Sequence, residues 1–270
     1  MDLTALRSAV GRIIAGLTDS AGKWKVRGFI DVDKRVYSLT ADTKVLSKAL
    51  ELVLLPGLLG YFKRVRARVE LAEHQNHYPD ISLTSSNEKV ALDIKTTYTL
   101  SARGGQVNGL TLGAYTGYFR DRRSAKNVTY PYSAYKHHIV LGLVYDRNTN
   151  IKVPEVFELR RLADILAAIK NIRYFVHEKW RLASDRPGSG NTKNIGSSTA
   201  LNRLIEGEGI FTRFGVREGK RVFDDYWQHY LTKEMARAAE LKKPPFTNLR
   251  EYLKYRNRRD LIAKLGPGDE

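Results

Sequence analysis

Apolar and polar residues alternate along two neighbouring runs of the chain, 80–84 and 90–95. A two-residue period is typical of β-strands, and a short polar stretch at 85–88 separates the two runs. The pattern therefore predicts a hairpin with a four-residue turn. Pairing Leu83 with Val90 brings every apolar side chain onto one face, whereas a slip of one residue would scatter them, so the hydrophobic pattern also predicts the register.

The same register puts Asp80 directly across from Asp93. Opposed Cβ atoms lie roughly 4.5–5.5 Å apart, and two like charges at that spacing destabilise a sheet. Lys95 follows Asp93 on the same face. A divalent cation bound by both carboxylates would remove the repulsion, and Lys95 could then orient or deprotonate a water molecule or balance the charge of a phosphate. A solvated strand face with a surface Asp–Lys pair would explain the hairpin alone equally well.

Helical and continuous apolar patterns surround this hairpin. Repeats of three and four residues predict an N-terminal helix over 3–17, and Asp42 is the predicted N-cap of a second helix that ends near Pro56. Further helices are predicted within 61–70, with a basic face, and over 159–169. Strands are predicted at 24–30, 35–39 and 172–176, and a strand buried on both faces at 138–144.

The composition is that of a folded, strongly basic protein. The 270 residues contain 46 Lys and Arg against 29 Asp and Glu, a net charge of +17, and 42% hydrophobic residues. One core is sufficient for this length, so we predict a single domain over 1–270. The positive charge predicts a polyanionic partner. Residues 213–264 carry 14 Lys and Arg against 7 Asp and Glu, and we expect this region to contact phosphates.

Membrane and secreted proteins have different patterns. No 18-residue apolar span is apparent, and Arg7 and Arg12 interrupt the N-terminal run, so we expect neither a transmembrane helix nor a signal peptide. The absence of cysteine excludes disulfides and thiolate metal sites and is compatible with a cytoplasmic location.

Residues 186–196 form a predicted loop rich in glycine and polar residues. It differs from a Walker phosphate-binding loop, because no Gly-Lys-Ser/Thr follows. Glycines let a backbone approach base edges closely, and an Asn amide can bind adenine N6 and N7 in the major groove. A surface loop without a binding function is the alternative for such a composition.

Pro79-Asp80 and Asp93-Ile94-Lys95 resemble the PD-(D/E)xK motif of metal-dependent nucleases. Longer stretches, in the same chain order, are similar to the EcoRV family of type II restriction endonucleases, and shorter matches spread the similarity over nearly the whole chain. The longer stretches are Asp42-Thr43-Lys44-Val45-Leu46-Ser47, Gln75-Asn76-His77-Tyr78-Pro79-Asp80, Asp93-Ile94-Lys95-Thr96-Thr97-Tyr98-Thr99 and Gly188-Ser189-Gly190-Asn191-Thr192-Lys193-Asn194-Ile195-Gly196.

The resemblance implies an α/β fold with a mixed, twisted β-sheet flanked by helices. It implies a Mg²⁺ cofactor, for which Mn²⁺ can substitute, with Asp80, Asp93 and Glu51 as the metal-binding residues. These three and Lys95 form the implied catalytic set. A histidine of the segment 74–77 is an alternative general base.

The resemblance also implies double-stranded DNA as the substrate, with the segment around Gln75 along the minor groove and the 186–196 loop in the major groove. Gly117 stands where family members carry a second hydroxyl, and Lys193 stands where they carry threonine. The residues expected to contact DNA are Gln75, Asn76, Lys44, Thr116, Lys126, Gly188, Ser189, Gly190, Asn191, Thr192, Lys193 and Asn194.

The expected activity is that of a type II site-specific deoxyribonuclease. It would act as a homodimer, joined around 19–40, on a palindromic site, GATATC, with a blunt central cut and a 5′-phosphate product. A cognate methyltransferase is expected in the same system, although not as a stable partner. Two alternatives are a non-catalytic sequence-specific DNA-binding protein, which the intact Asp80, Asp93 and Lys95 set disfavours, and a structure-selective PD-(D/E)xK repair nuclease, which the loop match disfavours.

Overall fold

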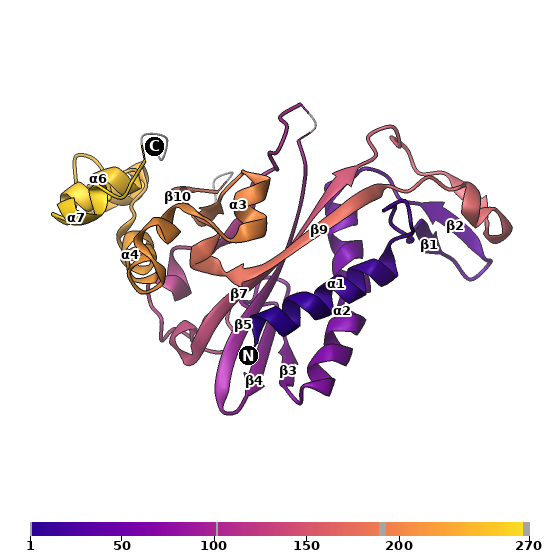
Figure 1. Ribbon diagram of the computed structural model, residues 1–270, viewed down its shortest axis with the longest axis horizontal. Coiled ribbons are helices and arrows are strands. Elements are labelled where there is room, and N and C mark those ends of the chain that lie inside the picture. Colours follow the sequence, from indigo (N-terminus) through magenta and orange to yellow (C-terminus); the bar gives the residue numbers. More distant parts are fainter. Residues whose placement is uncertain (1, 101, 189–192, 267–270) are drawn as a thin grey trace.

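A five-stranded sheet runs through the middle of the computed structural model, which describes residues 2–100, 102–188 and 193–266 (Figure 1). Its strands span Arg68–Leu71 (β3), Ile81–Ser85 (β4), Glu88–Tyr98 (β5), Tyr135–Arg147 (β7) and Ile169–Glu178 (β9). They lie in the order β3-β4-β5-β7-β9, with β5 and β7 parallel and the other neighbours antiparallel. The expected α/β fold with a mixed sheet is confirmed.

The β4–β5 hairpin has the predicted register. Leu83 faces Val90, and the predicted turn at 85–88 closes the hairpin. Ser86 and Asn87 lie at the centre of the turn with φ of 49° and 65°. Two residues in the left-handed region give a turn whose twist matches that of the paired strands. The turn therefore agrees with the register that the hydrophobic pattern requires.

Helices α1 (Leu3–Leu17) and α2 (Thr43–Arg64) cover one face of the sheet (Figure 1). Their apolar side chains pack with Leu92 and other residues of β4, β5 and β7. The opposite face carries a second cluster, in which Val140 packs with aromatic side chains, many of them from the C-terminal half of the chain. Strands β5 and β7 are therefore buried on both faces, as the apolar run 138–144 predicted.

Helix α2 begins where predicted but ends later. Oδ1 of Asp42, the N-cap, accepts hydrogen bonds from the amides of Lys44 at 2.9 Å and Val45 at 3.0 Å. The helix continues through Pro56 to Arg64, so the predicted end near Pro56 is wrong. Apolar side chains before and after the proline are buried in the core, and their packing outweighs the one hydrogen bond that proline cannot donate.

Of two further predicted helices, one is formed only over its first residues and the other is not an α-helix. Arg66 adopts φ of 55° and β3 follows it, so the helix predicted within 61–70 is wrong beyond the end of α2. Residues 159–169 form a short 3₁₀ helix, η3 (Leu159–Asp164), and then enter β9. Leucines of this stretch, such as Leu162, are exposed. Ile165 and Ile169 of the same stretch are buried, so its apolar side chains are divided between surface and core and do not form one helical face.

Among the described residues, α2 has the length and apolar composition of a membrane-spanning helix. The expectation that no 18-residue apolar span exists was therefore wrong. Helix α2 resembles a membrane-spanning helix in length and composition alone. Its buried residues pack in the same cluster as α1 and the central sheet. Core helices of globular proteins have the same composition.

Two three-stranded sheets flank the central one. Strands β1 (Gly28–Ile30), β2 (Arg35–Ser38) and β8 (Val156–Glu158) form the first, at the end of the molecule far from the C-terminal helices (Figure 1). Strands β10 (Ala183–Pro187), β11 (Asn194–Ser197) and β6 (Thr111–Ala114) form the second. The pairing of β11 with β6 brings the described ends of the 186–196 loop beside residues 111–116.

The C-terminal part is helical. Its α-helices are α3 (Leu201–Glu206), α4 (Val216–His229), α5 (Lys233–Ala238), α6 (Leu249–Tyr255) and α7 (Arg259–Ile262). The remaining 3₁₀ helices lie before or among them and are η1 (Gly117–Phe119), η2 (Tyr132–Ala134), η4 (Lys179–Arg181) and η5 (Ile210–Phe214). Phe223, Tyr226 and Trp227 of α4 are buried in the second cluster. This helix is therefore anchored to the domain by its aromatic side chains.

Candidate active site

Asp80 and Asp93 meet at the end of the β4–β5 hairpin that lies opposite the turn. The amide of Asp80 donates to Oδ1 of Asp93 at 3.3 Å, and the amide of Ile94 donates to Oδ2 of Asp80 at 2.7 Å. Each carboxylate is thus held by the backbone of the facing strand. Asp93 is 4% exposed, so this face of β5 is not the solvated surface that remained as an alternative.

Lys95 joins the two carboxylates. Its Nζ lies 3.1 Å from Oδ2 of Asp93 and 4.0 Å from Oδ2 of Asp80. The side chain of Lys95 is about three-quarters buried, and that of Asp80 is 29% exposed. The three residues of the predicted motif are therefore brought together in one partly open site.

The three groups influence one another's protonation. Burial, followed by the charge of Asp93, raises the pKa of Asp80 to about 6. Burial also acts to raise the pKa of Asp93, but the charges of Lys95 and Lys179 outweigh it and the pKa is lowered. Burial opposes the charged form of Lys95, yet the two carboxylates raise its pKa. At neutral pH Asp93 is ionised and Lys95 is protonated. Asp80, with a pKa of about 6, changes its protonation state close to neutral pH.

Glu51 reaches the same site from α2. A pocket of about 440 Å³ is lined by residues that include Glu51, Asp80, Lys95, His74 and Gln75. Oε2 of Glu51 lies 2.7 Å from Nζ of Lys48, its neighbour on the helix. Glu51 and Asp80 therefore line the same pocket, although in this structure the carboxylate of Glu51 is paired with a lysine.

The oxygen atoms of this site suit a hard divalent cation. Mg²⁺ is typically held by one or two carboxylates, with water and substrate phosphate as the remaining ligands. Asp80 and Asp93 supply two converging carboxylates, and burial followed by the negative charge of Asp93 raises the pKa of Asp80. Over the part of the chain that the structure describes, no three His, Cys, Asp or Glu side chains form a metal-binding group. Glu51, the third expected metal-binding residue, is therefore not grouped with the two aspartates in the described structure, and its role at the metal stays a prediction.

A buried aromatic layer lies on the same face of the sheet. The hydroxyl of Tyr78 lies 2.7 Å from Nδ1 of His138, and the ring of His138 stacks on Tyr132 with centroids 3.7 Å apart. Burial lowers the pKa of His138 well below its usual range, so the neutral imidazole accepts the hydrogen bond from Tyr78. Lys179 extends into this layer, with Nζ 4.2 Å from the centroid of Tyr78. Sequence reasoning missed Lys179, which lies three residues after the strand predicted at 172–176 and directly follows β9 as observed.

The other predicted DNA-contacting side chains lie on exposed segments. Gln75 and Asn76 are exposed in the loop that leads to the site, Lys44 is exposed in the first turn of α2, and Lys126 is exposed after η1. The positions are thus accessible, and their contacts with DNA remain predictions.

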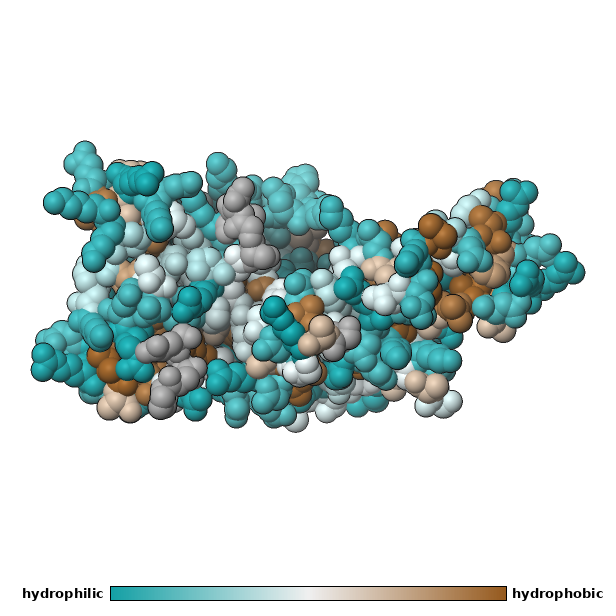
Figure 2. All heavy atoms as spheres, turned by 90° about the horizontal axis from the view of Figure 1, so that it is seen from above, coloured by the Kyte–Doolittle hydropathy of each residue, from teal (hydrophilic) through white to brown (hydrophobic). Residues whose placement is uncertain are grey.

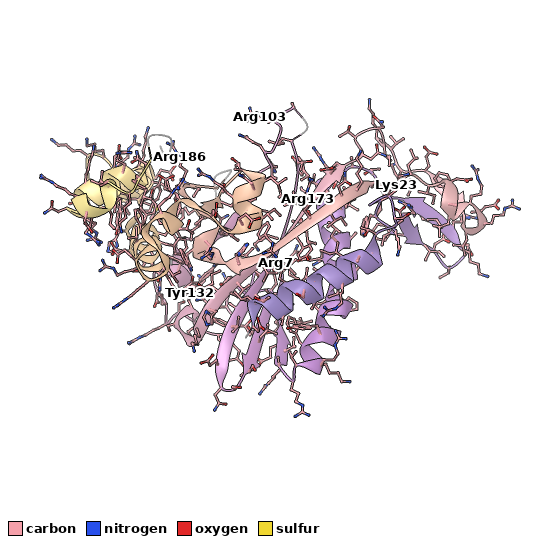
Figure 3. All side chains as sticks on the ribbon, viewed as in Figure 1. Arg7, Lys23, Arg103, Tyr132, Arg173 and Arg186 are labelled. Carbon is pink, nitrogen blue, oxygen red and sulfur yellow. The ribbon has the colours of Figure 1, made fainter. Side chains whose placement is uncertain are left out.

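Thr116 and the 186–196 loop are brought together by backbone pairing. The amide of Tyr115 donates to the carbonyl of Lys193, and the amide of Gly188 donates to that of Asn194, both at 2.9 Å. Ser189, Gly190, Asn191 and Thr192 lie outside the described residues. Figure 3 shows Arg103, from the loop after β5, and Arg186, from β10, along the upper edge of the molecule.

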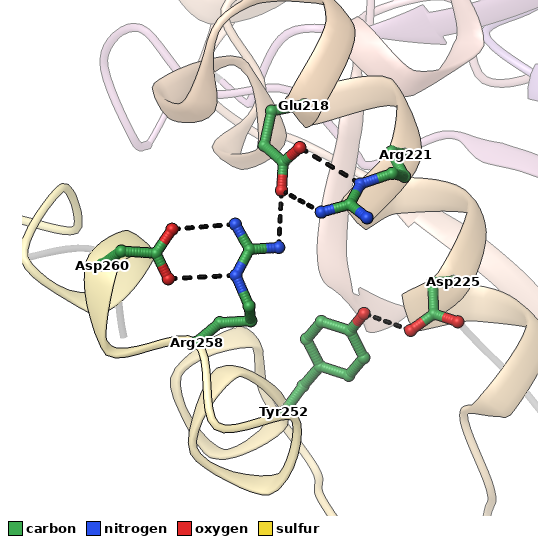
Figure 4. A network of polar contacts seen from close by, with 6 residues as sticks. All are labelled: Glu218, Arg221, Asp225, Tyr252, Arg258 and Asp260. Atoms are coloured by element: carbon green, nitrogen blue, oxygen red, sulfur yellow. Dashed lines mark hydrogen bonds and ion pairs between the residues drawn. The ribbon is translucent and has the colours of Figure 1, made fainter.

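The basic C-terminal region has much of its charge paired internally. Glu218 accepts hydrogen bonds from Arg221 and Arg258, each at 2.7 Å, and Arg258 also pairs with Asp260 at 2.8 Å (Figure 4). Arg256 lies 2.9 Å from Asp225, which also accepts a hydrogen bond from Tyr252. These three arginines are therefore paired with acids of the same region, and the surplus counted from the sequence lies with its other Lys and Arg side chains.

Comparison with known proteins agrees with this geometry. A family model described as restriction endonuclease EcoRV matches residues 20–257. The type II restriction enzyme EcoRV of Escherichia coli is 36% identical over 245 residues, which cover 89% of this chain and 94% of that enzyme. Members of this family are DNA-binding hydrolases of restriction systems, with double-stranded DNA as substrate and generally a divalent metal ion as cofactor. The chain belongs to the EcoRV family of type II restriction endonucleases.

Proposed function

We propose that this restriction endonuclease hydrolyses double-stranded DNA at GATATC, with a blunt central cut, using Mg²⁺ or, in its place, Mn²⁺. The observation that carries the proposal is the convergence of Asp80, Asp93 and Lys95, of which Asp80 and Lys95 line the pocket. A protein that only binds DNA would gain nothing from two facing carboxylates beside a polyanion. The convergence therefore favours catalysis over the non-catalytic alternative.

Asp80 and Asp93 would hold the metal ion, and Glu51 would assist from α2. The bound metal supplies Lewis acidity at the phosphate and lowers the pKa of a coordinated water. Lys95 is protonated at neutral pH because the carboxylates raise its pKa. Its part in the metal-free protein is therefore to orient water or balance phosphate charge, and not to accept a proton.

In the proposed reaction, the water oxygen forms a bond to phosphorus and the bond from phosphorus to the 3′ oxygen breaks. The water loses a proton and the 3′ oxygen gains one, so the products are a 3′-hydroxyl and a 5′-phosphate. Lys95, near the carboxylates and partly exposed to the pocket, can carry positive charge toward the additional negative charge of the transition state.

Recognition of the bases is assigned to the 186–196 loop. Support comes from the close match of the loop sequence to the family and from the pairing that holds its described ends beside residues 111–116. Gln75 and Asn76 would lie in the minor groove, and Lys44, Thr116 and Lys126 would contact the DNA backbone. Lys193, in place of the family's threonine, could add one phosphate contact.

We also propose a homodimer joined through the sheet β1-β2-β8 and η3, within and beside the region 19–40. Large apolar side chains gather on this arm, and Figure 2 shows them as brown surface at its end of the molecule. Ile30 is 58% exposed and Val32 98% exposed. Exposed apolar patches of this kind are typical of subunit interfaces. A two-fold dimer would let each subunit act on one strand of a palindrome.

The setting of the enzyme follows from the family. A restriction enzyme must reach DNA inside a cell, so we propose a cytoplasmic location and a cognate methyltransferase that protects the host's own sites. We further propose that the chain is one domain over 1–270, with 213–264 as a basic surface near DNA.

Digestion of a plasmid of known sequence, with and without Mg²⁺, followed by sequencing of the ends, tests the proposal. We expect blunt cuts at GATATC that require the metal. Discrete cuts at another sequence would retain the enzyme and reject the specificity. Tight binding without cleavage under any divalent ion would reject the assigned catalytic site.

A further inference from the structure

Lys179 places a charged ammonium group in the interior of the protein. It is the first residue of η4, directly after β9, and only 2% of its surface is exposed. Across the described chain, no group accepts a hydrogen bond from its Nζ. Burying an ammonium group without a partner costs several kcal/mol in general, so an uncharged residue would be the simpler choice for packing.

The sheet register puts Lys179 on the face that carries the two aspartates. Asp93 pairs with Val140 of β7, and Val140 pairs with His177 of β9. Paired residues share a face and the period along a strand is two, so a residue two positions after His177 follows on the face of Asp93. Lys179 is that residue, although the strand itself ends at Glu178.

Aromatic rings enclose the ammonium group. Nζ lies 4.2 Å from the centroid of Tyr78 and 5.4 Å from that of Tyr132. A Cβ atom at Gly113 would lie 3.5 Å from Nζ, so the backbone of β6 closes the space on another side. Cation–π contacts of this kind stabilise a desolvated cation and fix the position of the rings. Tyr78 is two residues before Asp80.

The charges near the site balance only when Lys179 is included. Asp80 and Asp93 carry two negative charges when ionised, and Lys95 supplies one positive charge. Asp93 is the charged group that most strongly favours the protonated form of Lys179, against the burial that lowers its pKa to about 8. Lys179 in turn is second to Lys95 among the charges that keep Asp93 ionised. At pH 7 Lys179 is therefore largely protonated.

We propose that Lys179 is a positioning residue of the catalytic centre, whose buried ammonium balances the second carboxylate charge of the Asp80–Asp93 pair and holds the Tyr78 ring beside the segment that carries Asp80. The inference rests on the proposed assignment of these aspartates to catalysis. Lys179 itself is enclosed by protein atoms and does not touch the substrate. Its part is to keep two carboxylates close together in the metal-free enzyme.

A double-mutant cycle in unfolding tests this without any cleavage. Lys179→Met keeps the length and apolar stem of the side chain and removes the charge, and Asp93→Asn removes the charge it balances. In EDTA at pH 7 and equal protein concentration, we expect Lys179→Met to raise the unfolding equilibrium constant about tenfold more when Asp93 is intact than when it is combined with Asp93→Asn. Lys136→Met, which removes an exposed ammonium paired with Glu88, is the matched control and should show no such coupling.

Equal effects of Lys179→Met with and without the Asp93→Asn change would overturn the proposal, because a lysine needed only for packing is indifferent to the charge of Asp93. If Lys179→Met does not fold, recovery of folding by the added Asp93→Asn change supports the proposal, and failure of both variants to fold overturns it.

Binding of Mn²⁺ alone gives a second measurement. Loss of the ammonium leaves the carboxylates more negative, so Lys179→Met should bind Mn²⁺ about fivefold more tightly than the unchanged protein in the absence of DNA, measured by calorimetry. Weaker or unchanged binding would overturn the proposal. Cleavage of plasmid DNA by the unchanged protein, measured in parallel, shows whether a failure lies with Lys179 or with the proposed function.

Discussion

The backbone N–H of Asp80 donates to Oδ1 of Asp93 at 3.3 Å, so one proposed metal-binding residue is held by the main chain of the other. The amide of Ile94 returns the contact to Asp80 at 2.7 Å. Both carboxylates are therefore positioned by the hairpin before metal or DNA binds. Preorganisation of this kind costs stability, because the two like charges are held together.

Asp80→Asn should stabilise the metal-free protein at pH 8. Folding raises the pKa of Asp80 from 3.8 to about 6, so the folded protein binds this proton more tightly than the unfolded chain. The contribution of Asp80 therefore favours folding below about pH 4 and is lost as pH rises through 6. Relative to the unchanged protein, the variant should gain up to about 3 kcal/mol at pH 8 and much less at pH 4.

Urea unfolding in EDTA at the two pH values checks this difference. Asp146→Asn is the control of opposite sign, because hydrogen bonds and Arg173 lower the pKa of Asp146 against the effect of burial. That variant should be destabilised at pH 8, and the effect should shrink at low pH. An Asp80→Asn protein that is less stable than the unchanged protein at pH 8 would contradict the prediction.

Asp93→Ala should abolish cleavage while DNA binding persists. Loss of one of two metal-binding carboxylates removes several kcal/mol of transition-state stabilisation, which corresponds to a fall in rate of roughly 10³-fold. Single-turnover cleavage and metal-free fluorescence anisotropy measure the two properties. Glu206→Ala, an exposed acid on α3, is the control and should leave both within about twofold. Unchanged cleavage by Asp93→Ala would reject the proposed metal site.

Arg258→Met should destabilise the C-terminal helices by about 1 kcal/mol. Arg258 pairs with both Glu218 of α4 and Asp260 of α7, so it joins two helices (Figure 4). Arg221→Met is the matched control, because Arg221 pairs with Glu218 on the same helix and is more exposed. Urea unfolding of both variants measures the difference. Equal effects would show that the contact between helices adds nothing.

Ile30→Asp should convert the proposed dimer into a folded monomer. A charge in the exposed apolar patch on β1 would be buried without a partner in the dimer, at a cost of about 3 kcal/mol or more and hence a dimer dissociation constant raised at least about 100-fold. Analytical ultracentrifugation measures the change. Leu241→Asp, an exposed apolar position after α5, should not alter the assembly. A dimer unaffected by Ile30→Asp would exclude this patch.

The hairpin was predictable because its information is local. A strict two-residue period allows one register of Leu83 against Val90 without scattering the apolar face, and that register alone brings Asp80 and Asp93 together. The N-cap of α2 at Asp42 was predictable for a similar reason, since one side chain satisfies amides two and three residues away.

The predictions of secondary structure failed where contacts between distant parts of the chain determine the local conformation. Pro56 was taken as a helix end, but packing of α2 against α1 and the sheet keeps the helix intact. The 159–169 stretch has helical periodicity, but its apolar side chains are divided between the surface and the core, and Ile169 begins β9 of the central sheet.

The sequence by itself determined the hairpin, its register and the pair of aspartates, because short-range periodicity and motif spacing are local properties. Only the tertiary structure decided that this polar face is buried, that Glu51 reaches the pocket, and that Lys179 lies on the same face, two strands away. A residue 86 positions from Asp93 acts on it only through folding. The physical reason is that charges interact through space, and the order of strands in the sheet is what sets that distance.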